Sequence, residues 1–207
     1  YKFLKEFLSY PEACSLFDVY NFHPYHFGVA PDELDTEKDS WHTVEQWTLF
    51  TSEILKDAVC ENKELWVTEM GYSLSGKDAE VAVSEDEQLS YVLRQKIILL
   101  SLGASKIAQT SDESFALSAR NKKLLRNVEN ILNGSTFVSY SQDGDSYCPY
   151  TSQCFYTENN YRADTGKIIY GLREAPQNQK IRQIYTFKKL GGTISVWWNR
   201  GDDKIFL

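Results

Sequence analysis

The stretch Leu65-Trp66-Val67-Thr68-Glu69-Met70-Gly71-Tyr72-Ser73 (residues 65–73) opens with an apolar run of strand length, and a carboxylate stands at the end of this run, before Gly-Tyr-Ser. Farther along the chain, Ser84 and Glu87 form a capping box, in which each side chain satisfies a free backbone N–H at the start of a helix. Apolar residues then recur at helical spacing up to Gly103, which ends the pattern. The sequence therefore predicts a strand followed by a helix.

The same order of strand and helix occurs on both sides of this stretch. Residues 16–22 form an apolar run of strand length, and residues 43–59 carry apolar side chains at helical spacing. Residues 105–110 are again a strand candidate, and residues 117–132 form an amphipathic pattern closed by a glycine. The side chains expected to face inward on that last helix are Leu124, Leu125, Val128, Ile131 and Leu132. This alternation favours a parallel sheet with helices outside it.

The composition of the sequence changes at about Thr136. Apolar residues no longer recur at helical spacing, and Gly, Asp, Asn, Ser and Tyr become common. Residues 168–172, 181–188 and 193–199 are strand candidates, and Leu190-Gly191-Gly192 suits a hairpin turn between the last two. We therefore expect an α/β part over residues 1–138 and a small antiparallel β domain over residues 139–207.

Composition and charge exclude several classes of protein. The chain has 207 residues, of which 42% are hydrophobic and 14% aromatic, which excludes a disordered or collagen-like chain. Residues 1–103 carry a net charge of −11 and residues 104–207 a net charge of +4, but neither part has the Lys/Arg stripe that binds phosphate backbones. We expect no nucleic-acid partner and, because no apolar run approaches ~20 residues, no membrane span.

The four cysteines favour an oxidising compartment. Cys148 and Cys154 are close enough in sequence to form a disulfide without strain, and pairing Cys14 with Cys60 completes the even count. Asn133 begins an Asn-Gly-Ser glycosylation triplet. These features indicate a secreted or lumenal protein. The alternative is four reduced, buried thiols in a cytosolic protein.

The end of the first strand carries polar residues that could bind a ligand. Pro24 ends the strand near His23, because proline cannot donate to the ladder. His23 and Tyr25 are then expected at the carboxyl end of the parallel sheet, where ligands bind in α/β folds. Their alternative roles are a capping histidine and a packed tyrosine. His23 and His26 lack a third ligand at suitable spacing, so we expect no metal.

Glu69 is a candidate functional residue because its charged side chain follows an apolar strand. A carboxylate after a strand buried on both faces is unfavourable unless it is hydrogen-bonded or takes part in the function of the protein. The alternative is a structural carboxylate that accepts from a neighbouring Arg or Tyr. Asp112 and Ser111 fit a helix cap or turn better than a catalytic role, and Asp143-Gly144-Asp145 fits a turn better than a calcium site. The absence of a G-x-S-x-G elbow argues against a serine triad.

With these segments in order, the sequence resembles the C-terminal half of clan A glycoside hydrolases, the retaining (β/α)8-barrel enzymes such as β-xylosidases and relatives of α-iduronidase. Residues 18–25 resemble the sixth barrel strand with its His-Pro-Tyr, and residues 66–73 resemble the seventh, whose Thr-Glu-x-Gly-Tyr/Trp-Ser carries the nucleophile. Residues 88–105 resemble the next helix and its approach to strand eight, and residues 185–187 and 194–197 resemble the β domain appended to many of these barrels.

The resemblance implies strands 6–8 of a barrel followed by an antiparallel β-sandwich domain, and retaining hydrolysis of O-glycosyl bonds. It implies that Glu69 is the nucleophile, that His23, Tyr25, Asn21 and Tyr72 contact the sugar, and that no cofactor takes part. Tyr25 would hydrogen-bond Glu69 and keep it ionised. The expected partner is a carbohydrate, in a secreted or lysosomal protein.

The chain also departs from the family pattern. The acid/base glutamate of these enzymes follows strand four in an Asn-Glu pair, and no such pair stands at a strand end here. Ala108-Gln109-Thr110 replaces the aromatic residue that is frequent on strand eight. We therefore expect the N-terminal barrel half to be supplied in the same or another chain, and the isolated chain to be inactive. The alternative is a structural or carbohydrate-binding glycoprotein that has lost catalysis.

Overall fold

The computed structural model describes residues 2–26, 28–33, 42–60, 62–74, 82–110, 112–142, 145–147, 182–199 and 205–206. The chain divides into two compact units, Tyr1–Asn127 and Val128–Leu207. The first is mixed α/β and the second is an antiparallel sheet, in agreement with the expected fold class at this level.

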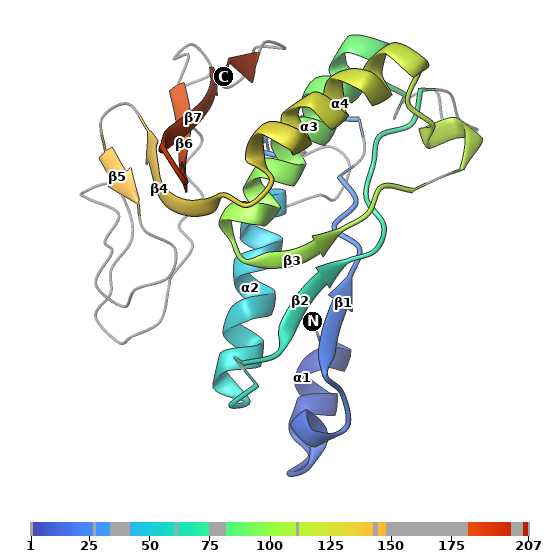
Figure 1. Cartoon of the computed structure of the whole chain (residues 1–207). Coiled ribbons are helices and arrows are strands. Elements are labelled where there is room, and N and C mark those ends of the chain that lie inside the picture. The colour runs from blue at the N-terminus through green and yellow to red at the C-terminus, as the bar shows by residue number, and fades with distance from the viewer. Residues whose placement is uncertain are drawn as a thin grey trace. The chain divides into compact units, whose positions relative to one another are not determined.

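The first unit contains the predicted parallel sheet. Its strands β1 (Val19–Phe22), β2 (Glu64–Val67) and β3 (Ala104–Ile107) lie in the order β1-β2-β3, and both pairs are parallel (Figure 1). Sequential strands therefore lie side by side, and their carboxyl ends meet at one edge of the sheet. The assignment of these strands as strands 6–8 of a barrel stays a prediction.

Helices α2 and α3 begin where the sequence signals predict, and α4 begins two residues after the predicted start at residue 117. The α-helices are α1 (Lys2–Leu8), α2 (Val44–Asp57), α3 (Glu85–Ser101) and α4 (Ala119–Leu132), and the short 3-10 helices are η1 (Ala13–Ser15) and η3 (Glu113–Phe115). Capping boxes start α2 at Thr43 and α3 at Ser84. After α3 the backbone takes a φ of 88° at Gly103, which favours glycine and ends the helix.

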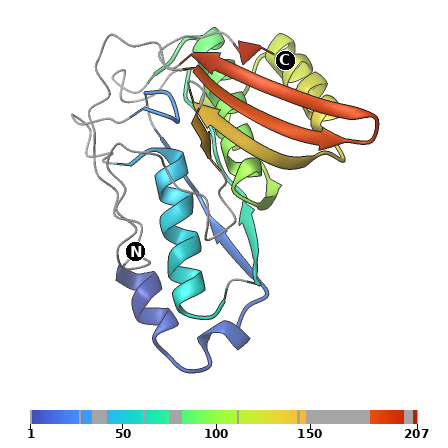
Figure 2. The ribbon, with the colours of Figure 1, turned by 90° about the vertical axis from the view of Figure 1, so that its left-hand side faces the viewer.

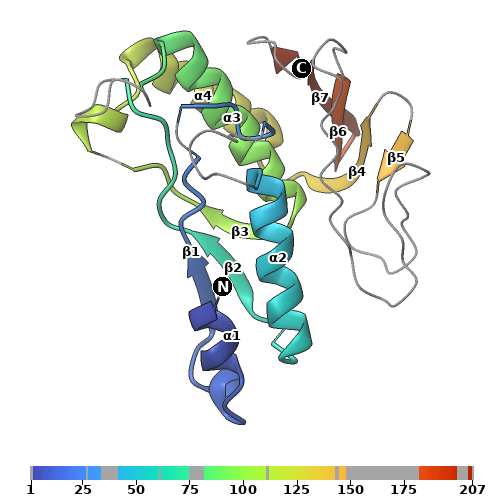
Figure 3. The same cartoon turned by 180° about the vertical axis from the view of Figure 1, so that it is seen from behind.

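Helices α2 and α3 cover one face of the sheet. Each connects one strand to the next parallel strand, and right-handed crossovers in the same direction place both helices on one side, as the opposite views of Figures 1 and 3 show. Leu65 and Val67 of β2 face this layer and are buried. On the other face Glu64 and Lys106 are exposed.

The described helix α4 corrects part of its predicted inward face. Leu125 and Leu132 are buried, but Leu124 is 38% and Ile131 is 41% exposed. The inward stripe is narrower than the hydrophobic pattern suggests, and it includes a polar residue. Asn121 is fully buried and its Nδ2 donates to the carbonyl of Glu85 at 2.8 Å.

The predicted disulfide between Cys14 and Cys60 is present and joins the N-terminal segment to the end of α2. The Cα atoms of the two cysteines are 5.6 Å apart. The disulfide lies in an apolar cluster in which α1 packs against α2; the buried members are Leu4, Leu8, Ala13, Ile54, Leu55 and Cys60. Cys148 and Cys154 lie outside the described residues.

The second unit is an antiparallel sheet in the order β5-β4-β6-β7-β8. Its strands are β4 (Thr136–Gln142), β5 (Asp145–Tyr147), β6 (Arg182–Lys189), β7 (Gly192–Asn199) and β8 (Ile205–Phe206). The β6–β7 hairpin, conspicuous in Figure 2, confirms the predicted strands at 181–188 and 193–199 and the turn between them. The predicted strand at 168–172 lies outside the described residues, and the expected sandwich and the boundary at residue 138 stay predictions.

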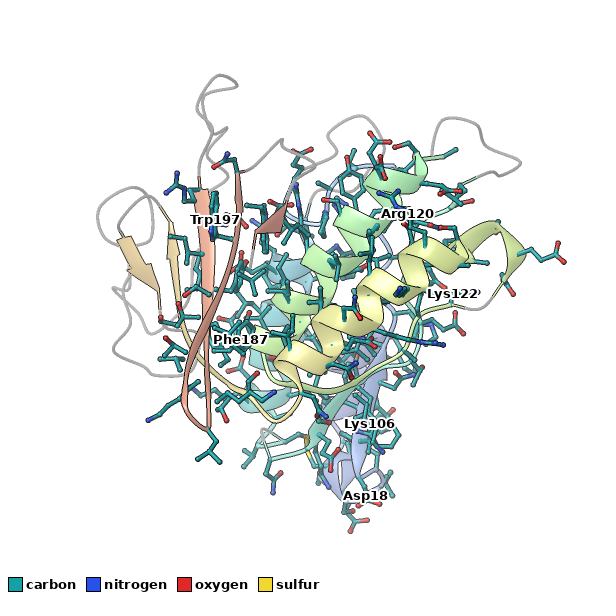
Figure 4. All side chains as sticks on the ribbon, turned by 45° about the horizontal axis from the view of Figure 1, so that its top comes forward. Asp18, Lys106, Arg120, Lys122, Phe187 and Trp197 are labelled. Carbon is teal, nitrogen blue, oxygen red and sulfur yellow. A yellow bond between two sulfur atoms is a disulfide. The ribbon has the colours of Figure 1, made fainter. Side chains whose placement is uncertain are left out.

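Alternation of side chains gives this sheet an aromatic face. Tyr185 stacks on Trp198 with ring centroids 5.0 Å apart, and the Tyr140 ring lies 4.7 Å from that of Tyr185. Phe187 also faces this side, whereas Trp197, labelled with it in Figure 4, alternates to the opposite face.

Candidate functional site

Polar side chains from all three segments that follow the parallel strands meet at the carboxyl edge of the sheet. His23 and Tyr25 follow β1, Thr68 and Glu69 follow β2, and Thr110 follows β3. Backbone hydrogen bonds extend the pairing of β2 and β3 past the strands, since Ala108 N donates to Val67 O at 2.8 Å and Thr110 N to Met70 O at 2.9 Å. This continued pairing brings the third segment to the other two.

Tyr25 links all three segments. Its phenol donates to Glu69 Oε2 at 2.9 Å, and its oxygen lies 2.5 Å from Thr110 Oγ1. A phenol has a single proton, so the Thr110 hydroxyl donates to Tyr25 while Tyr25 donates to Glu69. The three groups thus form a chain of hydrogen bonds that ends on the carboxylate.

Burial raises the pKa of the Tyr25 phenol, and the hydrogen bond to Glu69 and the charges of Glu69 and Asp112 raise it further, while Thr110 opposes the shift. The phenol therefore stays protonated as a donor at neutral pH. A phenol held in this way keeps the carboxylate oxygen that it faces in a fixed position.

His23 lies on the other side of the Glu69 carboxylate. Its Nδ1 is 3.7 Å from Glu69 Oε2, and the two side chains are 38% and 49% exposed. Its Nε2 is 3.0 Å from Thr68 Oγ1. Because the Thr68 hydroxyl gives its proton to Asn21 Oδ1 at 3.0 Å, the His23 Nε2–H donates to Thr68. Nδ1 therefore faces the Glu69 carboxylate, at a distance longer than a direct hydrogen bond.

Asn21, the last predicted polar residue of the first strand, acts on this group through Thr68. Its Oδ1 accepts from both the backbone N–H of Thr68, at 3.1 Å, and the Thr68 hydroxyl. Its Nδ2 also lies 3.4 Å from His23 Nε2. Because Nε2 carries the proton donated to Thr68, it does not accept from the Asn21 amide, and the exposed Asn21 side chain can present its amide hydrogens to a ligand.

Tyr72 does not join the exposed group. It is fully buried, and its ring packs edge-on against that of Tyr91 with centroids 5.1 Å apart. Burial raises the pKa of its phenol well above the ordinary value. Tyr72 therefore supports the segment after β2 from inside.

Two members of the group, Thr68 and Thr110, were missed by the sequence interpretation. Both stand just after a strand of the parallel sheet, the position that identified His23 and Glu69. Threonine is common in strands for steric reasons, so its type alone gave no signal.

The remaining sequence candidates lie apart from this group. His26 is buried, with Nδ1 3.3 Å from the carbonyl of Val29. Asp112 stands at the N-cap position of η3 and makes no capping hydrogen bond with its side chain. Asn133 is exposed in the turn after α4.

Ser111, Asp143 and Gly144 are outside the described residues. Within the described ranges, no three His, Cys, Asp or Glu side chains are grouped as metal ligands.

Chemically, the arrangement presents a carboxylate with one oxygen held by a phenol, beside an imidazole and an amide that can bind hydroxyl groups. Such a carboxylate can act as a nucleophile or as an acceptor for a polyhydroxylated ligand. Comparisons of the chain with protein-family models, curated proteins and solved structures found no match. In the part of the chain that the structure describes, no helix has the length and apolar character needed to cross a bilayer.

Proposed function

We propose that the chain carries the nucleophile of a retaining glycoside hydrolase, and that Glu69 is this nucleophile. The observation that carries the proposal is the hydrogen bond of 2.9 Å from Tyr25 to Glu69, formed at the carboxyl edge of a parallel sheet. Catalytic groups of α/β barrels stand at this edge. The bond orients the carboxylate while leaving about half of the side chain exposed.

In the proposed reaction, a Glu69 oxygen attacks the anomeric carbon as the glycosidic C–O bond breaks. The leaving oxygen takes a proton from a second carboxyl group, and an ester between the sugar and Glu69 forms. Water, deprotonated by that second group, then attacks the same carbon and releases Glu69. A retaining mechanism places the two carboxyl groups roughly 5–5.5 Å apart.

The second carboxyl group belongs, in this proposal, to the other half of a (β/α)8 barrel, supplied in the same or another chain. The open sheet face supports this assignment, because parallel sheets are ordinarily covered on both faces, whereas Glu64 and Lys106 on this face are exposed. His23 and Asn21 would bind sugar hydroxyl groups beside Glu69.

The disulfide supports a secreted or lysosomal location for this proposed enzyme. Disulfides persist in oxidising compartments and are rare in the cytosol. The Cys14–Cys60 disulfide and the exposed position of Asn133 in its glycosylation triplet both fit such a location.

A second candidate function is carbohydrate binding without catalysis. One observation favours it: among the described residues, the Glu69 carboxylate is contacted by Tyr25 and His23 and by no other carboxyl group. The same three side chains could hold sugar hydroxyl groups without a reaction.

The experiment that separates the two candidates uses 2-deoxy-2-fluoroglycosyl fluorides. Fluoride leaves without needing a proton, so these reagents test the nucleophile even where the second carboxyl group is missing. A panel of sugars is incubated with the full chain, and the labelled peptide is identified by mass spectrometry.

We expect a label on Glu69, its loss in Glu69→Gln, and its retention in Glu64→Gln, which changes an exposed glutamate at the opposite end of β2. Absence of a label with every sugar, together with sugar binding measured by calorimetry, would establish the binding function instead.

A further inference from the structure

A buried side-chain amide of helix α3 hydrogen-bonds the segment that contains His23 and Tyr25. Gln95 is fully buried, and its Nε2 donates to the carbonyl of Pro24 at 2.6 Å. Pro24 is the middle residue of a tight turn closed by a hydrogen bond of 2.9 Å from Tyr25 N to His23 O. One side chain of α3 therefore fixes the peptide between the two residues that flank Glu69.

A second amide from the same helix reaches the segments after β2 and β3. Gln88 is also fully buried, and its Nε2 donates to Tyr72 O at 2.8 Å and to Phe115 O at 3.3 Å. Tyr72 follows Glu69 closely in the chain, and the Phe115 ring packs against that of Tyr25 with centroids 5.8 Å apart. Gln88 thus holds the backbone near both members of the hydrogen-bonded pair.

Burial of these glutamine side chains destabilises the fold unless their N–H groups donate hydrogen bonds. They lie two helical turns apart on one face of α3. In the described part of the chain, the Oε1 atom of each is buried without a hydrogen-bond partner, and such an atom destabilises the folded state. An apolar side chain at either position would avoid this cost but could not donate to a carbonyl.

An ion pair adds a further tie between α3 and the segment after β1. Arg94, next to Gln95 on α3, lies 3.5 Å from Asp32, and both side chains are almost fully buried. Three buried polar residues of α3, Gln88, Arg94 and Gln95, therefore contact segments that follow the strands of the parallel sheet.

We propose that Gln95 and Gln88 are positioning residues that set the geometry of Tyr25 against Glu69. Gln95 does so through the turn at Pro24, and Gln88 through the carbonyls of Tyr72 and Phe115. The consequence for catalysis rests on the proposed function, whereas the consequence for the geometry of the pair does not.

The test replaces Gln95 by methionine, which keeps the length of the side chain and removes the donor. The readout is the titration of Tyr25, followed by NMR in protein with ring-labelled tyrosine and assigned with Tyr25→Phe. In Gln95→Met we expect the pKa of Tyr25 to fall towards that of an exposed tyrosine, because the phenol moves away from Glu69 and into water. The control is Asp86→Asn, at an exposed ion pair between α3 and Arg120, which is labelled in Figure 4.

A folded Gln95→Met protein in which Tyr25 titrates as in the wild type would overturn the proposal. Should the variant not fold, the wild-type protein still decides the question through hydrogen exchange of the Gln95 side-chain amide. Strong protection is expected for a buried donor to Pro24, and exchange as fast as that of an exposed amide would overturn the proposal.

The fluoroglycoside reaction separates this proposal from the function on which it depends. If the wild type is labelled, Gln95→Met should lower the maximal labelling rate by about tenfold with little change in the half-saturating concentration, since misplacement of reacting groups costs rate. An unlabelled wild type whose Tyr25 titration responds to Gln95→Met would refute the glycosidase and support the positioning role.

Discussion

The Tyr25 phenol donates to Glu69 Oε2 at 2.9 Å across two neighbouring parallel strands. The residues are separated by 44 positions in the sequence, so the bond exists only because β1 and β2 pair in parallel and end at the same edge. The donor, Tyr25, has a raised pKa. The acceptor, the Glu69 carboxylate, is about half exposed.

Glu69→Gln is expected to lower the pKa of Tyr25. The carboxylate raises that pKa both as a hydrogen-bond acceptor and as a negative charge, and the amide keeps the size of the side chain but not the charge. NMR titration of labelled tyrosine measures the change, and Glu64→Gln serves as the control at a distant carboxylate of the same strand. A Tyr25 titration that is unchanged in Glu69→Gln would show that the bond does not form in solution.

Gly71→Ala is expected to destabilise the protein by about 1–3 kcal/mol, since non-glycine residues are strained at such dihedral angles. Gly71 has a φ of +152°, and an added Cβ would lie 3.3 Å from Cδ1 of Phe115, the ring that packs on Tyr25. Thermal and denaturant unfolding measure the loss.

The matched control is Gly134→Ala, at a φ of +72° where an added Cβ would meet nothing within 4 Å. This variant carries backbone strain without the contact, so it should leave the Tyr25 titration unchanged while Gly71→Ala alters it. Equal effects of the two variants on Tyr25 would contradict a role for the contact with Phe115.

Tyr72→Phe is expected to stabilise the protein slightly, by about 1 kcal/mol, because it removes a buried hydroxyl that lacks a partner among the described residues. The variant should also lose less stability in alkali. The pKa of Tyr72 is raised above its ordinary value of 10.0, so its contribution to stability is complete below pH 10 and is lost as the pH rises towards the folded-state pKa. Denaturant unfolding at several alkaline pH values measures both effects, and a variant less stable than the wild type would indicate a partner for the hydroxyl.

Asn133 is expected to carry an N-linked glycan when the chain is produced in a secretory cell. The residue is exposed, in the turn that follows α4, and begins an Asn-Gly-Ser triplet. Treatment with a peptide-N-glycosidase should increase the gel mobility of the wild type and of Ser135→Thr, which keeps the triplet, but not of Asn133→Gln. An unchanged wild type would remove this support for a secretory route.

The parallel sheet and the helix starts could be predicted because their signals are local. Thr43 and Ser84 cap their helices through residues only three positions away, and the apolar runs have strand length. The same rule placed His23 and Glu69 at one edge of the sheet. The sequence interpretation could not separate Tyr72 from them, because the direction of a side chain after the end of a strand depends on backbone angles such as the positive φ of Gly71.

The part of the site that escaped prediction depends on distant contacts. Thr110 reaches Tyr25 only because β3 continues its pairing with β2 past the last strand residue. Gln88 and Gln95 look like ordinary polar residues of an amphipathic helix, and their burial follows from the packing of α3 on three segments from elsewhere in the chain. No pattern of period 3.6 contains that information.

Removal of the disulfide in Cys14→Ala/Cys60→Ala is expected to destabilise the first unit strongly. The disulfide joins residues 46 positions apart, and the loss of such a constraint on the unfolded chain costs about 2–4 kcal/mol. Cys60 is also fully buried in the cluster in which α1 packs on α2, so the change removes apolar contacts as well. Denaturant unfolding measures the loss, and a reducing agent should destabilise the wild type more than the variant.

Peptide mapping without reduction supplies the control, since it should recover residues 14 and 60 in one cross-linked product. A chain that yields two free thiols at these positions and is insensitive to reducing agent would contradict both the disulfide and its use as an argument for an oxidising compartment. In that case α1 would be held to α2 by the apolar cluster without a covalent link. The secreted or lysosomal location would then depend on Asn133 by itself, because cysteine is often buried as a thiol in cytosolic proteins.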